Sequence, residues 1–229
     1  MGKEIRVTKT LTFVHTSSVH IATFDQLLDE IAPDIPVHHI VDETLLQDAR
    51  TFGFTDALRT RVTETLIQAF VADAGVVVCT CSTIGGYAEQ ALADPTRPVL
   101  RVDRAMAQHA VSIGSRIVVA AALASTLAST SSLLYDAAHT IGKTIKLHEL
   151  FCDDAWAYFE QGDMLGYNQV ITAHLHQAAS VGDVIVLAQA SMAGSIPFCT
   201  DITVPILSSP RLGVQTAIQT YQNMKWSGQ

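Results

Sequence analysis

Short apolar runs alternate along the chain with segments whose apolar residues recur every three or four positions. Residues 75–79 form a continuous apolar run, which is typical of a parallel strand buried on both faces. The helical pattern is clearest over residues 58–73, with apolar side chains at Leu58, Val62, Leu66, Ala69 and Phe70. By the same criteria we predict strands over residues 6–15, 37–41, 75–79 and 98–102, and helices over residues 24–31, 58–73 and 87–93. This alternation predicts an α/β fold with a parallel sheet and right-handed crossovers.

The second half of the chain repeats the pattern of the first. Residues 76–86 align with residues 184–194, and each segment is an apolar strand followed by small and polar residues. Three further matches occur at nearly the same spacing, pairing residues 17–18 with 125–126, residue 37 with 145, and residues 98–100 with 205–207. Matches in this order predict two duplicated, pseudo-symmetric open parallel-sheet α/β domains, residues 1–102 and 103–210. We expect the C-terminal helix, residues 211–229, to pack back on the first domain.

The composition narrows the class of protein. Apolar residues make up 48% of the chain and charged residues 16%, yet no apolar run approaches the ~20 residues of a membrane span. The first residues lack the apolar core of a signal peptide, so we expect a cytoplasmic protein with no membrane partner. A net charge of −8 without a basic stripe argues against nucleic acid as a partner. The high apolar fraction also leads us to expect a homo-oligomer.

The four cysteines do not have the spacing of a disulfide framework or of a zinc ribbon. Cys79 and Cys81 could supply two metal ligands, but no other His or Cys pair has matching spacing. We therefore predict no metal site. The chain also lacks a phosphate-binding loop and a dinucleotide-binding glycine motif, so no cofactor is indicated.

Hydroxyl side chains gather where predicted strands end, which is the edge at which open parallel sheets bind ligands. They could simply be N-caps of the following helices, which is the commonest role of Ser and Thr there. Their occurrence in both repeats instead favours a cradle for a carboxylate or phosphate. The candidate substrate-binding residues are Thr16, Ser17, Ser18, Ser82, Thr83, Ser125, Thr126, Ala190 and Ser191.

Cys81 is the candidate reactive residue of this edge. It follows an apolar strand and precedes a helix, where the helix dipole would stabilise a thiolate. A cysteine in an apolar run is more often inert, and this is our interpretation of Cys79. The polar neighbours of Cys81 favour a functional role.

The segment 76–85 resembles the first cysteine motif of the aspartate/glutamate racemase superfamily, in which a strand ends in Cys followed by a small polar residue and Thr. The likeness continues through residues 39–43, 98–103, 114–119 and 204–210. It implies two pseudo-symmetric α/β domains with the active site in the cleft between them. The superfamily includes cofactor-independent amino-acid and hydantoin racemases, maleate isomerases and arylmalonate decarboxylases. Its racemases use two cysteines, one from each half, on opposite faces of the substrate carbon.

The sequence departs from this pattern at the second cysteine, because Gln189 occupies the position that corresponds to Cys81. A Gln amide cannot exchange a proton as a thiol does. A single thiol could still act as base or nucleophile, with another acid such as His15.

Three hypotheses therefore remain open for a small-carboxylate substrate. The first is an isomerase or racemase with Cys81 as base or nucleophile and Gln189 as its hydrogen-bonding partner. The second is a lyase, such as a decarboxylase, that uses one thiol as proton donor. The third is a binding protein without catalytic activity.

Overall fold

The computed structural model describes residues 9–224, which form two four-stranded parallel sheets with the same strand order. The first sheet has the order β2-β1-β3-β4 and the second the order β6-β5-β7-β8. The strands are β1 (Thr10–His15), β2 (Val37–Val41), β3 (Ala74–Cys79), β4 (Val99–Arg101), β5 (Arg116–Ala121), β6 (Lys146–Phe151), β7 (Val184–Leu187) and β8 (Ile206–Ser208). The predicted fold class, duplicated parallel α/β units, is confirmed.

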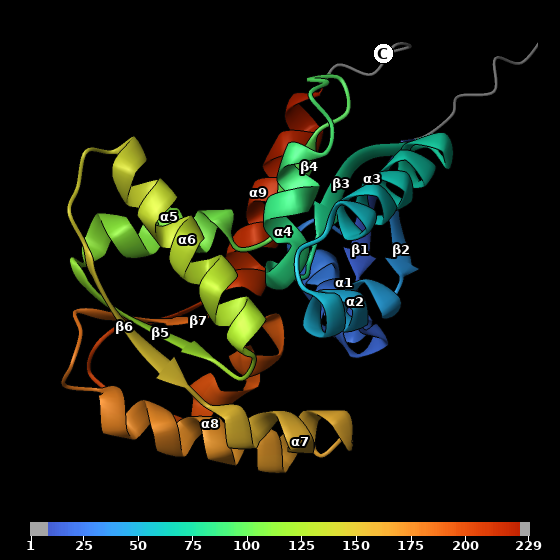
Figure 1. Ribbon diagram of the computed structural model, residues 1–229. Coiled ribbons are helices and arrows are strands. Elements are labelled where there is room, and N and C mark those ends of the chain that lie inside the picture. Colours follow the sequence, from blue (N-terminus) through green and yellow to red (C-terminus); the bar gives the residue numbers. More distant parts are fainter. Residues whose placement is uncertain (1–8, 225–229) are drawn as a thin grey trace, which may run out of the picture.

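Helices flank both sheets, and Figure 1 shows the first half in blue to green and the second in yellow to orange. The first half contains α1 (Ile21–Ile31), α2 (Thr44–Phe52), α3 (Asp56–Val71), α4 (Ser82–Gln90) and the 3-10 helix η1 (Ser18–His20). The remaining helices are α5 (Arg104–Ile113), α6 (Ala124–Thr140), η2 (Asp153–Ala155), α7 (Trp156–Glu160), α8 (Met164–Ala178), η3 (Ala190–Phe198) and α9 (Ser209–Asn223). Among the described residues, none of these helices has the length and apolarity needed to cross a membrane.

The C-terminal helix α9 returns to the first half, although it follows the last strand of the second. Val214, Ala217 and Ile218 are buried in one cluster with Leu11 and Phe13 of β1. In Figure 1 this red helix runs between the two halves, and it also packs on α5. The apolar face of α9 therefore ties the halves together.

The largest differences in extent between prediction and structure concern two elements. The helix predicted over residues 87–93 begins five residues earlier, at Ser82, and ends at Gln90. The prediction missed the first turns of this helix because they contain Gly85 and Gly86, and glycine is a weak helix former. Of the strand predicted over residues 6–15, the structure shows the part from Thr10 onward, and residues 6–8 lie outside the described region.

Candidate active site in the cleft between the two halves

A cavity of about 360 Å³ lies at the carboxyl ends of the central strands, between the two halves. In both sheets this is the point where the strand order reverses, which is where open α/β sheets bind ligands. We define the floor of the cavity as the lining residues that come soon after the central strands, namely Thr16, Ser17, Thr80, Cys81, Ser82, Thr83, Thr126, Gln189, Ala190 and Ser191. Its remaining lining is made by His20, Glu43, Leu46, Gln47, Arg50, Leu123, Trp156, Phe159 and Glu160.

Cys81 is the only cysteine among these lining residues, and it is the N-cap residue of α4. Its side chain is almost covered, with a relative exposure of 9%. Burial raises the pKa of the Cys81 thiol, although hydrogen bonds from the Thr16 hydroxyl and from the backbone of Ile84 and Thr83 oppose that rise. The sequence predicted a stabilised thiolate at this helix N-terminus. In the structure burial has a larger effect than these hydrogen bonds, so the pKa of the Cys81 thiol lies above its ordinary value and the protonated form is favoured.

Alkylation of each cysteine, followed by mass spectrometry, measures this balance. We expect Cys81 in the ligand-free protein to react with iodoacetamide several-fold more slowly at pH 7 than a free thiol, because the thiolate is the nucleophile. The rate should rise steadily into the alkaline range. Rapid reaction at pH 7 that no longer increases above pH 8 would show that the hydrogen bonds outweigh burial.

Gln189 faces the cavity from the second half, at the end of β7 and before η3. Its side-chain Oε1 accepts a hydrogen bond from the backbone amide of Ala122 at 2.7 Å. Its Nε2 is buried and has no partner among the described residues, and the same is true of the Ser82 hydroxyl. Buried polar groups are normally hydrogen-bonded, so these two groups in one cavity indicate a ligand that would complete them.

Some of the other predicted hydroxyl residues line the cavity and others do not. Thr83 and Thr126 form a 2.7 Å hydrogen bond that joins α4 to α6 across the two halves. Ser191 is held by the Tyr167 hydroxyl at 2.9 Å. Ser18 and Ser125, which the repeat aligned with lining positions, are not part of the cavity wall: Ser18 is exposed in η1, and Ser125 is half-buried on α6.

His15 lies beneath the cavity and does not line it. Its ring has no exposed surface, and its pKa is lowered to about 3 by burial and then by the neighbouring His39 and His20. A neutral, covered imidazole cannot meet a substrate directly as an acid. Instead its Nδ1 is hydrogen-bonded to the Thr80 hydroxyl at 2.8 Å, and Thr80 does line the cavity.

The sequence reasoning missed the outer wall of the cavity. Arg50 of α2 reaches Glu160 of α7 at 2.8 Å, and its guanidinium lies 5.3 Å from the centre of the Trp156 ring. Arg50 is the one Lys or Arg in the described lining. The helix that carries it was not predicted, and the two partners are 110 residues apart in the chain, so no local pattern could reveal the contact.

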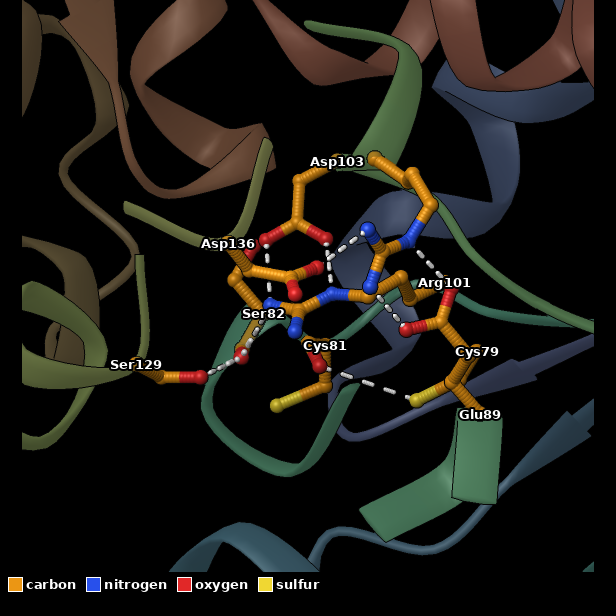
Figure 2. Close-up of polar contacts among 9 residues, drawn as sticks. Cys79, Cys81, Ser82, Glu89, Arg101, Asp103, Ser129 and Asp136 are labelled. Carbon is orange, nitrogen blue, oxygen red and sulfur yellow. Dashed lines mark hydrogen bonds and ion pairs between the residues drawn. The ribbon is translucent and has the colours of Figure 1, made fainter. Parts of the chain in front are cut away.

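A buried ion pair between Arg101 and Asp103 contacts the first turn of α4, next to Cys81 (Figure 2). Arg101 binds Asp103 through Nε at 2.7 Å and through Nη2 at 3.0 Å, and both side chains are almost fully covered. The carbonyl oxygen of Ser82 accepts hydrogen bonds from Arg101 Nη2 at 3.5 Å and from Ser129 Oγ at 2.7 Å. Gly85 lets this arginine pack on α4, because a Cβ there would lie 3.1 Å from Arg101 Nε. The pair therefore positions the first turn of α4, which carries the cavity groups.

The remaining cysteines do not replace the missing second thiol. Cys152 and Cys199 are packed in an apolar cluster of the second half, away from the cavity wall. Burial raises the pKa of Cys152 to about 12 and also raises that of Cys199. Within the described residues no group of three or more His, Cys, Asp or Glu side chains could hold a metal ion.

Neither protein-family models nor curated protein sequences match the chain. Solved structures do match it over nearly its whole length. A glutamate racemase isoform from Bacillus anthracis is 17% identical with a TM-score of 0.70, over 93% of this chain and 82% of that one. Picrophilus torridus aspartate racemase is 13% identical with a TM-score of 0.71, over 93% and 94%. Unliganded arylmalonate decarboxylase is 14% identical with a TM-score of 0.57, over 95% of each chain.

These likenesses concern the fold. The chain has the fold of the aspartate/glutamate racemase superfamily, as its resemblance to that group implied. The reaction has to be argued from the residues of the cavity.

Proposed function

We propose that this protein, which has the fold of the amino-acid racemases, is a cofactor-independent isomerase of racemase type that acts on a small carboxylate through Cys81. The observation that carries the proposal is one cavity whose lining includes a thiol at a helix N-terminus and two residues with a buried polar group that lacks a partner, Ser82 Oγ and Gln189 Nε2. Donors of this kind suit a carboxylate oxygen.

The proposed chemistry follows from the positions of these groups. The substrate carboxylate would accept hydrogen bonds from Gln189 Nε2 and the Ser82 hydroxyl, which spread the negative charge that develops when a neighbouring carbon loses a proton. Cys81, as thiolate, would take that proton, and the resulting thiol would return it. Because Gln189 replaces a second thiol, return to the opposite face needs either a turn of the intermediate or a proton from another donor.

A second candidate function is favoured by the protonation state of Cys81. Burial raises the pKa of this thiol, which favours its protonated form. A decarboxylase needs such an acid: the carbon–carboxylate bond breaks, carbon dioxide leaves, and the electron pair on carbon takes the thiol proton. Racemases and arylmalonate decarboxylase share this fold, so both reactions suit its cleft.

The test is an isotope experiment on the whole protein in deuterium oxide. The probes are single enantiomers of aspartate and glutamate, maleate, and malonates that carry one aryl or alkyl substituent. Deuterium in recovered substrate together with loss of optical activity, or conversion of maleate, would support the isomerase. Release of carbon dioxide with one deuterium in the product would support the lyase. Binding in calorimetry with neither outcome would contradict both and support a binding protein.

A further inference from the structure

We propose that Asp25, His39, His15 and Thr80 form a proton relay between the surface of the first half and the Cys81 cavity. The inference rests on the proposed function, because a relay serves a thiol that gives or takes protons. It adds a role for Asp25, His39 and His15, which lie outside the cavity wall.

The four side chains form an unbroken chain of hydrogen bonds. Asp25 Oδ1 lies 2.9 Å from His39 Nε2, and His39 Nδ1 lies 2.8 Å from His15 Nε2. His15 Nδ1 then lies 2.8 Å from the Thr80 hydroxyl. Each imidazole uses both ring nitrogens, one toward each neighbour. Thr80 ends the chain at the cavity wall, next to Cys81 in the sequence.

One end of this hydrogen-bonded chain is exposed and the other is buried. The side chain of Asp25 is 51% exposed and that of His39 is 14% exposed. His15 is 0% exposed and Thr80 is 2% exposed. The chain therefore begins in solvent and ends at the floor of the cavity.

Aromatic side chains surround the buried part of the chain. The Phe13 ring lies 5.6 Å from that of His39, centre to centre, and the Phe24 ring lies 5.5 Å from that of His15. Phe13 and His15 lie on β1, His39 lies on the paired parallel strand β2, and Phe24 lies on α1. Because these rings cover His15, a proton can reach or leave its imidazole only through its hydrogen-bonded neighbours, His39 and Thr80.

The chain accommodates two directions of hydrogen bonding. In the first, the Thr80 hydroxyl donates to His15 Nδ1 and His15 Nε2 donates to His39 Nδ1. His39 Nε2 then donates to Asp25. In the second, His39 holds one more proton and donates through Nδ1 to His15 Nε2. His15 then donates through Nδ1 to Thr80, whose hydroxyl turns to the Val14 carbonyl oxygen at 3.1 Å.

The step from the second arrangement to the first delivers one proton to the cavity. The Thr80 hydroxyl turns from the Val14 carbonyl oxygen toward the cavity, its O–H bond breaks as the proton passes to a base there, and the His15 Nδ1 proton replaces it. The His39 Nδ1 proton moves to His15 Nε2, so His39 changes from imidazolium to neutral imidazole. With a Cys81 thiolate as the base, the thiolate and the imidazolium are neutralised together. The reverse sequence removes a proton.

The surroundings of His15 disfavour its charged form, so in the relay it passes a proton on without remaining protonated on both ring nitrogens. The titratable groups that face the two histidines are Asp25 from α1 and His20 from η1. Burial lowers the pKa of His20 to about 4, so both His15 and His20 are neutral near pH 7. Of the two histidines in the relay, His39 is the one that lies beside a carboxylate, 2.9 Å from Asp25 Oδ1, so the proposal places the extra proton at this exposed end.

The experiment is nitrogen NMR of histidine-labelled full-length protein between pH 5 and pH 9, which distinguishes the two tautomers of a neutral imidazole. We expect His15 to remain neutral but to change from the Nε2–H to the Nδ1–H tautomer as the pH is lowered. A purely structural hydrogen bond would not make this change. A His15 ring that keeps one tautomer across the range would overturn the relay, whether or not the protein is an enzyme.

Two variants sharpen the result. His39→Gln retains a polar side chain but cannot pass a proton, so the tautomer of His15 should no longer change with pH. His38→Gln alters the exposed histidine next to it on β2 and should leave the change intact. If a turnover assay is found, His39→Gln should lower kcat about tenfold or more with KM unchanged. Equal effects of both variants on the tautomer change would overturn the relay.

Discussion

Replacing Cys81 with serine is expected to lower kcat/KM for the proposed reaction by about 10²–10⁴-fold, the usual contribution of one positioned acid or base. The change exchanges sulfur for oxygen within an N-cap position that tolerates serine well. Because an alcohol is a far weaker acid than a thiol, it can neither donate the proton nor hold the charge. The measurement is deuterium exchange or carbon dioxide release, with the active probe from the isotope experiment.

The matched control is Cys199→Ser, which removes a thiol from the core of the second half and does not alter the cavity wall. It should retain near full activity. Calorimetry should show that Cys81→Ser still binds the probe, since the carboxylate donors Ser82 and Gln189 remain. If Cys81→Ser keeps more than half of the rate, some other group transfers the proton and the proposed role of the thiol is wrong.

Replacing Asp103 with alanine is expected to lower the free energy of unfolding by about 3–5 kcal/mol. Asp103 has 0% exposure and holds Arg101 through two hydrogen bonds, so its loss leaves a buried guanidinium without its carboxylate. Removing one member of a buried pair costs more than removing both, because an uncompensated charge remains in the interior. Urea denaturation of the purified protein measures the change.

Two companion variants test this explanation. Arg97→Ala breaks an ion pair with Asp94 whose side chains are 52% and 44% exposed, and it should cost less than about 1 kcal/mol. The double variant Arg101→Met, Asp103→Leu should be more stable than Asp103→Ala, because it removes both charges. A loss below about 1 kcal/mol for Asp103→Ala would mean that water reaches Arg101 and that the pair does not hold α4 in place.

Local patterns in the sequence were sufficient for the sheets and for the central residue of the site. Residues 75–79 and 184–187 are apolar runs whose ends carry Cys81 and Gln189 after a short loop. A short apolar run that alternates with helical segments is typical of a buried parallel strand, and the polar residues that follow it fall at the ligand-binding edge of the sheet. The internal repeat extended this inference to both halves. It also revealed that one of the two equivalent thiol positions holds an amide.

Tertiary structure alone decided what surrounds those residues. The distance between Arg50 and Glu160 depends on how two halves pack, and nothing in either segment indicates the partner. The protonation of Cys81 and of His15 depends on burial, which is a property of the assembled fold and not of the neighbouring residues.

The amino-acid sequence by itself thus determined the elements, their duplication and the strand ends at which chemistry can occur, because hydrophobic periodicity acts over a few residues. Which side chains meet there, which lie beneath the cavity, and how readily each gives up a proton were decided only when distant segments packed together. Desolvation and hydrogen bonding act through space, so His15 became part of a buried chain and not a member of the cavity wall.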